Sequence, residues 1–151
     1  GLTGRLYQTL VIAQKLAVNV GAYSDSSRLD NGEFMIYAVP APQVDFAELA
    51  RAIDDEITTM QTAEVGADSL RRAKRQLMSD LVFARDSQQS MANIFGSAAM
   101  IGLSPDDVLA WVDEIDAVTA NDVRRAAQAF LKPHHSVTGH LTGEMETGGQ
   151  P

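Results

Sequence analysis

The three histidines are the side chains best suited to hold a catalytic metal ion, and all lie near the C-terminus, at His134, His135 and His140. A catalytic zinc site needs three protein ligands that converge on one ion. If this region is a strand, His134 and His135 point to opposite faces, and His134 and His140 lie about 20 Å apart at roughly 3.3 Å per residue. We therefore interpret them as surface histidines and predict no catalytic, cofactor-binding or metal-ligating residue in the chain.

Two runs of charged residues are the next candidates for a site. The basic residues within 71–75 suit an acidic partner, but core positions interrupt them, and so few charges on an acidic chain make a weak field. The carboxylates of 54–56 are consecutive on a predicted helix, so they spread round its polar side and do not form a pair. We interpret both runs as solvated helix faces. They comprise Arg71, Arg72, Lys74 and Arg75, and Asp54, Asp55 and Glu56.

The sequence lacks the local motifs of common catalytic centres. GxSxG, P-loop, GxGxxG, HExxH and HxxEH patterns are all missing. Because there is no Cys, disulfides, thiolate catalysis and cysteine zinc sites are excluded. No His and acid lie at a spacing that would make Ser87, Ser90 or the Ser26-Ser27 pair a catalytic nucleophile. From the residues alone, the chain is an interaction module or the structural half of an enzyme, with a small-ligand binding domain as a third alternative.

The composition fits one acidic globular domain. The 151 residues are 45% hydrophobic and 21% charged, a balance that can bury a core. The 12 basic and 20 acidic residues leave a net charge of −8, which argues against binding to nucleic-acid phosphates or anionic lipid. No apolar run approaches the roughly 20 residues of a membrane-spanning helix. Because Gly1 leads directly into a helical pattern, we expect the chain to be a piece of a longer protein.

Periodicity predicts a helix followed by two antiparallel strands in the N-terminal part. The helix covers Thr3–Gln14, with Thr3 as its N-cap. A two-residue period then predicts a strand over Leu16–Tyr23, and the returning strand covers Glu33–Val39 after a polar turn that ends at Asn31-Gly32. One side of the first strand holds Leu16, Val18, Val20 and Ala22.

Capping signals and apolar stripes divide the middle of the chain into helices. Asp45 with Glu48 three residues on has the form of a capping box, and Gly102 is a plausible helix end. A second long helix covers about Asp68–Asp86. Ser104 is an N-cap followed by Pro105 at the first helical position and an acid in the first turn, and Thr119 with Asp122 opens the last helix in the same way. The stripes include Leu70, Ala73, Leu77, Leu81 and Ala84, and, in the last helix, Val123, Ala126, Ala127 and Phe130.

A final strand and a tail complete the predicted domain. Alternation predicts a strand over Ser136–Leu141, followed by a flexible Gly-rich tail over 143–151. The strands and the helices are separated along the chain. This separation predicts an α+β domain, a two-layer sandwich whose mainly antiparallel sheet is covered on one face by helices. Three strands are few under so many helices. We therefore expect the first strands to lie upstream of Gly1, and we assign 1–142 to a partial domain.

Five segments in order resemble the second, non-zinc domain of insulinase-like zinc peptidases, family M16, in the bacterial branch similar to mitochondrial processing peptidase. Gly4–Val11 looks like the family's Ser-Arg-Leu-Tyr-Gln-x-Leu-Val helix, and Leu16–Val20 and Gly32–Ile36 look like the two strands after it. Leu70–Leu77 is similar to the Leu-x-Arg-Ala-Lys-x-Gln-Leu helix. Ile115–Val123 resembles the Ile-x-Ala-Val-Thr-x-x-Asp-Val helix entry. The resemblance spans about 1–142.

The resemblance implies the C-terminal, inactive domain of a bacterial M16B zinc metalloendopeptidase, a clamshell of paired domains with the metallohydrolase fold of mitochondrial processing peptidase. The zinc, its HxxEH motif and the general base would lie on another domain of the parent or on its partner. This chain would form part of the peptide-binding chamber and of the subunit contact. The implied partners are the N-terminal M16 domain, a homo- or heterodimer subunit and the peptide substrate, and the implied location is the bacterial periplasm.

Two positions depart from the pattern of active members. There, the domain that faces the zinc carries an Arg and, seven residues later, a Tyr that bind the substrate backbone. The matching positions here hold Val11 and Val18. Apolar side chains cannot polarise a scissile carbonyl or hold a peptide by hydrogen bonds. Either a partner supplies the Arg–Tyr pair, or the chain belongs to a structural or assembly subunit with an M16-like fold and no peptidase activity.

Overall fold

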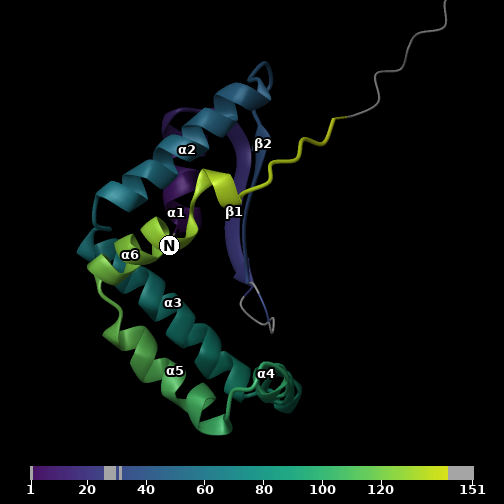
Figure 1. The fold of residues 1–151 in the computed structure, drawn as a ribbon, viewed down its shortest axis with the longest axis vertical. Helices are drawn as coiled ribbons and strands as arrows, with labels where there is room; N and C mark the ends of the chain where they lie inside the picture. Colours follow the sequence, from purple (N-terminus) through teal and green to yellow (C-terminus); the bar gives the residue numbers. More distant parts are fainter. Residues whose placement is uncertain (1, 26–29, 31, 143–151) are drawn as a thin grey trace, which may run out of the picture.

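The computed structural model describes residues 2–25, 30 and 32–142, and these form the α+β fold that the sequence predicts. In chain order the elements are α1 (Leu2–Leu6), the π-helix η1 (Tyr7–Ala13), β1 (Ala17–Asp25), β2 (Glu33–Pro40), α2 (Phe46–Thr62), α3 (Ala67–Arg85), α4 (Gln88–Met100), α5 (Pro105–Ala117), α6 (Ala120–Phe130) and the short 3-10 helix η2 (Pro133–His135). The hairpin β1–β2 and helices α3–α5 form the two arms of an open crescent, joined by α2 and α6 (Figure 1).

The N-terminal helix supplies the centre of the core. It begins at Leu2, so Thr3 lies inside the helix and the N-cap predicted there is wrong. Helix α1 continues directly into η1, and both contact β1. Leu6 and Leu10 are four residues apart and therefore share one face. Both have no exposed surface, which makes this face the most completely buried one among the described residues.

A β-bulge in the hairpin decides which side chains of β1 face the helices. The two strands pair antiparallel as predicted, but their register shifts between Ala17 and Asn19, so Val18 is an extra residue in β1. Ala17 and Val20 are consequently both buried at 3% exposure, whereas Val18 is 55% exposed. The prediction that Val18 shares a side with Val20 is wrong, because strict alternation cannot anticipate a bulge.

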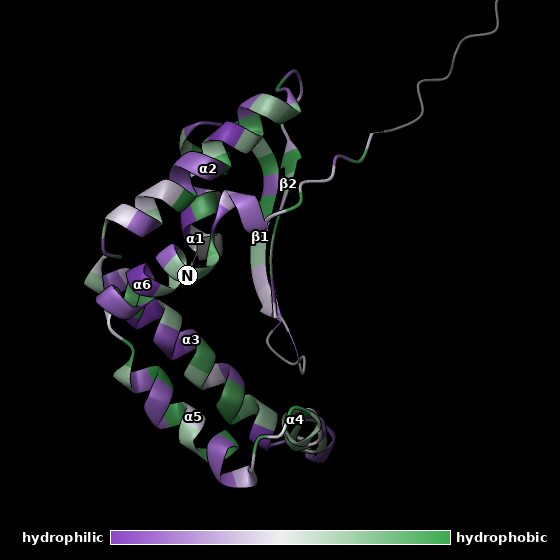
Figure 2. Ribbon diagram, in the orientation of Figure 1, coloured by the Kyte–Doolittle hydropathy of each residue, from purple (hydrophilic) through white to green (hydrophobic). Residues whose placement is uncertain are grey.

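The main core lies between the hairpin, the N-terminal helix and α2. Its buried side chains are Leu6, Leu10, Ala17, Val20 and Leu49. Burying a leucine side chain contributes roughly 1.5–3 kcal/mol, so the two N-terminal leucines and Leu49 supply most of the local hydrophobic stabilisation. Hydrophobic residues also recur along the helices of the other arm, where this cluster does not reach (Figure 2).

Side-chain caps define the helix starts as predicted. The Asp45 carboxylate accepts a 2.6 Å hydrogen bond from the Glu48 backbone N–H at the start of α2. Full capping boxes open α5 and α6, where Ser104 pairs with Asp107 and Thr119 with Asp122. Helix α4 ends at a glycine, Gly102, with φ +85°. An L side chain there would be strained, which explains why glycine marks this helix end.

The predicted final strand over Ser136–Leu141 is wrong. This segment has no regular secondary structure, and the sheet formed by the described residues contains only β1 and β2. Val137 is fully exposed and Leu141 is 95% exposed. Alternation assigns faces, but a strand forms only when a neighbouring backbone accepts its hydrogen bonds. The predicted tail over 143–151 and most of the turn that ends at Asn31-Gly32 lie outside the described residues.

Two apolar helix stripes are less covered than their spacing predicts. No residue of α3 is buried, and Leu77 is 52% exposed. Phe130, predicted on the inner side of the last helix, is 77% exposed, although Ala127 in the same helix is buried. Helical spacing identifies the apolar face, but burial depends on whether another element packs against it.

The packing of Tyr37 over Gly21 gives a test of the hairpin. A Cβ added to Gly21 would lie 2.6 Å from Tyr37 Cε1, so the ring must move. Gly96 in α4 has no atom within 4 Å of an added Cβ. We expect Gly96→Ala to stabilise the chain by about 0.5–1 kcal/mol in chemical denaturation. Gly21→Ala should give no such gain.

The same substitution in a second background provides the control. In a Tyr37→Ala variant, Gly21→Ala should recover a stabilisation of about 0.5–1 kcal/mol, because the obstructing ring is absent. Equal effects of Gly21→Ala in the two backgrounds would show that Tyr37 does not lie over Gly21.

Candidate functional site

The histidines do not converge. His134 and His135 belong to η2, and their rings meet edge to face with centroids 4.3 Å apart. His140 instead stacks on Phe46 at the start of α2, with ring centroids 4.5 Å apart and planes at 10°. Over the residues that the structure describes, no three His, Cys, Asp or Glu side chains are grouped so that they could hold a metal ion.

One member of the acidic run in α2 has a structural partner. The Arg5 guanidinium Nε lies 2.6 Å from the Glu56 carboxylate, and the Glu56 side chain is only 13% exposed. The interpretation of all three carboxylates as a solvated face is therefore wrong for Glu56, which turns inward and links α2 to α1. Asp54 and Asp55 lie on the exposed side of the helix, as predicted.

The basic residues of α3 do not act as one patch. Arg71 pairs with Asp68 at 3.3 Å within the helix, and Lys74 donates a 2.5 Å hydrogen bond to the backbone carbonyl of Asp116 at the end of α5. Arg72 lines a pocket of about 570 Å³ together with Arg5. The interpretation as a solvated face holds for Arg71, whereas Lys74 ties two helices together.

Val11 and Val18 occupy different environments. Val11 is half-buried and packs against the core cluster, whereas Val18 stands exposed at the bulge of β1. Neither side chain has a polar atom, so neither can donate a hydrogen bond to a peptide carbonyl. The structure therefore places no hydrogen-bonding side chain at these two positions; their match to the family's Arg–Tyr pair stays a prediction.

Four uncharged side chains lie together on the outer face of the hairpin, at positions that the sequence did not identify as a site. Tyr23, Met35, Tyr37 and Val39 each expose between 40% and 49% of their surface there. Tyr23 donates a hydrogen bond to the Met35 sulfur at 3.0 Å. Once the register is known, the alternation of residues 33–39 identifies this face. We call these four residues the outer hairpin face.

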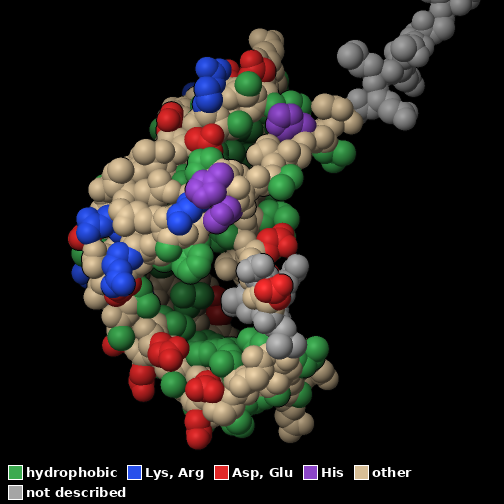
Figure 3. Space-filling model, in the orientation of Figure 1, with side chains coloured by type: hydrophobic (Ala, Val, Ile, Leu, Met, Phe, Trp, Pro, Cys, Tyr) green, Lys and Arg blue, Asp and Glu red, His purple; other side chains and the backbone are tan. Residues whose placement is uncertain are grey.

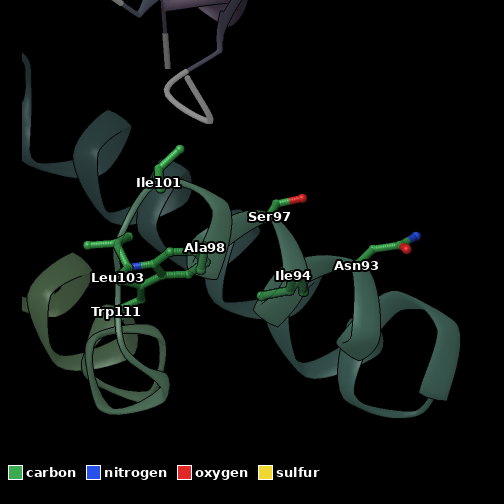
Figure 4. A pocket seen from close by; sticks show the side chains of 7 residues that line it. All are labelled: Asn93, Ile94, Ser97, Ala98, Ile101, Leu103 and Trp111. Carbon is green, nitrogen blue, oxygen red and sulfur yellow. The ribbon is translucent and has the colours of Figure 1, made fainter. Parts of the chain in front are cut away.

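Helices α3, α4 and α5 enclose a second apolar surface. Two adjoining pockets of about 520 and 410 Å³ share Ile94 and Trp111, and we call them together the arm groove. In Figure 4, Leu103 and Trp111 lie against Ala98, whereas Ser97 projects from α4. The remaining lining residues are Asn93, Ile101, Leu77, Asp80, Leu81, Ala84, Glu114 and Ile115.

Sequence comparison decides the family. No curated protein matches the chain. The family model described as the peptidase M16 inactive domain matches residues 1–77, just over half of the chain. The chain belongs to this family. The M16 resemblance inferred from the five segments is therefore confirmed, and it is the inactive domain, as expected from the lack of a zinc motif.

Solved structures share the fold of this M16 inactive domain. The inactive peptidase domain of a candidate zinc protease from Bordetella parapertussis superposes with a TM-score of 0.77 at 19% identity, covering 94% of this chain and 77% of that one. A candidate zinc protease from Bordetella pertussis Tohama I gives 0.76 at 21% identity, covering 86% and 71%. A protease from Helicobacter pylori gives a TM-score of 0.74 at 16% identity. The superposition covers 85% of this chain but only 30% of that protein.

No helix among the described residues of the M16 inactive domain is both long and apolar enough to cross a membrane.

The capping carboxylates are the groups whose acidity the fold changes most clearly. The backbone and side-chain hydrogen bonds of Ser104 lower the pKa of Asp107 below its usual value of 3.8. The side-chain and backbone hydrogen bonds of Thr119, with a smaller contribution from Arg125, lower the pKa of Asp122 in the same way. Both carboxylates stay charged at the positive ends of their helices.

These shifts predict how acid affects the M16 inactive domain. A carboxylate whose pKa is lower in the folded state than in the unfolded state stabilises the fold at pH values above its unfolded-state pKa. This stabilisation is lost as the pH falls through the folded-state pKa. In thermal unfolding, Asp107→Asn with Asp122→Asn should lower the midpoint at neutral pH and flatten its fall between about pH 5 and pH 2. At neutral pH, Asp106→Asn, outside both capping boxes, should lower the midpoint by less than the double variant does. If the midpoint of the double variant falls in acid as steeply as that of the unmodified chain, these caps do not contribute to the acid dependence of stability.

Proposed function

We propose that the chain is the non-catalytic C-terminal domain of an M16B-type zinc metalloendopeptidase, where it forms part of the peptide-binding chamber and of the subunit interface. Membership of the M16 inactive-domain family carries this proposal, and the solved neighbours described as candidate zinc proteases support it. The proposal is consistent with the described residues, in which no three His, Asp or Glu side chains are grouped so that they could hold a metal ion.

The zinc would lie on the N-terminal M16 domain of the same protein or on a partner subunit. When bound there, zinc would supply a water of lowered pKa as the nucleophile for peptide hydrolysis. The residues of this chain would contribute binding and orientation only. The exposed, uncharged side chains of the outer hairpin face suit contact with an unfolded peptide, because aromatic rings and the polarisable Met thioether gain from apolar contact.

A second candidate function is a structural or assembly subunit with this fold and no peptidase activity. Val11 and Val18 favour it, since they leave the two matching positions without a hydrogen-bonding group. In the peptidase proposal, the partner domain supplies that pair. Both candidates keep the chain itself free of catalysis, and they differ in whether the complete assembly cleaves peptides.

Reconstitution tests the peptidase proposal. The 151-residue chain alone should not cleave a fluorogenic unfolded peptide, whereas the whole protein with its natural partner should cleave it and lose the activity on chelation of zinc. Absence of cleavage by the whole assembly with zinc supplied would favour the structural subunit. Cleavage by the isolated chain would contradict both candidates.

A substitution tests the chamber surface in the active assembly. Tyr37→Glu places a charge on the outer hairpin face and should raise the KM for an apolar peptide by about tenfold with little change in kcat, because it removes binding and leaves chemistry intact. Phe130→Glu introduces the same charge at a 77% exposed position on α6 and should leave KM unchanged. Equal kinetics for the two variants would exclude the outer hairpin face from peptide binding.

A further inference from the structure

The arm groove combines an apolar floor with an acidic surrounding. Ile94 and Trp111 lie at its centre, where its two pockets adjoin, and both are partly buried with some surface open to the groove. Asp80 and Glu114 line the same groove. Open apolar pockets of this size on a monomeric surface are typical of interaction sites, particularly when polar groups surround them.

Charge is unevenly distributed along the chain: α4 and α5, on one side of the groove, lie in an acidic stretch, whereas α3, on the other side, holds two acidic and five basic residues. Residues 86–123, which contain α4 and α5, include seven of the 20 acidic residues and none of the 12 basic residues or three histidines. This stretch therefore holds −7 of the net charge of −8. Figure 3 agrees: acidic and hydrophobic side chains cover the part of the surface over α4 and α5, while the Lys and Arg side chains in view lie over the other half.

The two groove carboxylates have no cation of their own. Within the described residues, neither Asp80 nor Glu114 forms an ion pair, and Asp80 accepts only a 2.9 Å hydrogen bond from the Gln76 side chain. Lys74 of the same arm is engaged with the Asp116 carbonyl. Arg85 of α3 lines an adjoining pocket with Leu81 and Ile94. Because Asp80 and Glu114 line the groove without an ion-pair partner among the described residues, they can pair with the cations of a bound segment.

We propose that the arm groove binds a polypeptide segment of a partner that carries both apolar and cationic side chains. Apolar side chains of the segment would cover Ile94 and Leu103, and its Lys or Arg side chains would pair with Asp80 and Glu114. A guanidinium or ammonium group over the face of Trp111 would add a cation–π contact. The proposal concerns binding alone and does not depend on whether the whole protein cleaves peptides.

Trp111 is the only tryptophan in the chain, so its fluorescence reports directly on the groove. The full 151-residue chain is titrated with three synthetic peptides of one length, in which Leu alternates with Lys, with Glu or with Ser. The Leu–Lys peptide should change Trp111 emission in a saturable way and bind more weakly at high salt, because salt screens exposed charges. The Leu–Glu and Leu–Ser peptides should bind at least about tenfold more weakly.

Matched charge variants separate the groove carboxylates from net charge. Asp80→Asn with Glu114→Gln should weaken the Leu–Lys peptide by about 3- to 30-fold, as expected for two exposed ion pairs. Asp106→Asn with Asp113→Asn removes the same charge from residues that do not line the groove and should change binding by less than about twofold. Circular dichroism checks that both variants fold.

Three results would overturn the proposal. Equal binding of the Lys and Glu peptides, or equal weakening by the two double variants, would show that the groove does not select cations. A Trp111 signal that depends on protein concentration without peptide would instead identify a second copy of the chain as the occupant of the groove.

Discussion

The contact of Leu6 and Leu10 with β1 is the interaction on which the rest of the structure depends. These two side chains are completely buried, and they join the N-terminal helix to Ala17 and Val20 of the hairpin and to Leu49 of α2. An isolated two-stranded hairpin is marginal in water, so the hairpin needs this apolar backing to persist. Truncating a buried leucine typically costs about 2–5 kcal/mol, a large share of the stability of a domain this size.

The bulge at Val18 lets Ala17 and Val20 both turn toward that core. Beyond the bulge, regular alternation places Tyr23, Met35, Tyr37 and Val39 on the opposite side of the hairpin. The other arm is held differently, by α3, α4 and α5 packing on one another and by the hydrogen bond from Lys74 to the end of α5. The crescent thus presents two exposed apolar surfaces of different charge: a neutral one on the hairpin and an acidic one on the helices.

Local chemistry made part of this architecture predictable from the sequence. The helix starts at Asp45, Ser104 and Thr119 depend on bonds within four residues, so their patterns identify them correctly. Apart from the N-cap predicted at Thr3, where the helix begins one residue earlier, the failures involve distant partners. The bulge at Val18, the inward turn of Glu56 toward Arg5 and the unpaired segment 136–141 depend on which elements pack together, and a single sequence does not encode that in any short pattern. The arm groove was missed for the same reason, because no short pattern shows that α3, α4 and α5 bring Trp111 and Ile94 to a shared opening.

The central claim is that this M16 inactive domain supports chemistry performed by another domain. Zinc content tests it most directly, measured by elemental mass spectrometry on the isolated chain and on the whole protein with its natural partner. The account predicts no stoichiometric zinc in the isolated chain, and zinc in the assembly that disappears when the metal ligands of the other domain are substituted. Stoichiometric zinc in the isolated chain, or zinc retained by the assembly after that substitution, would contradict it.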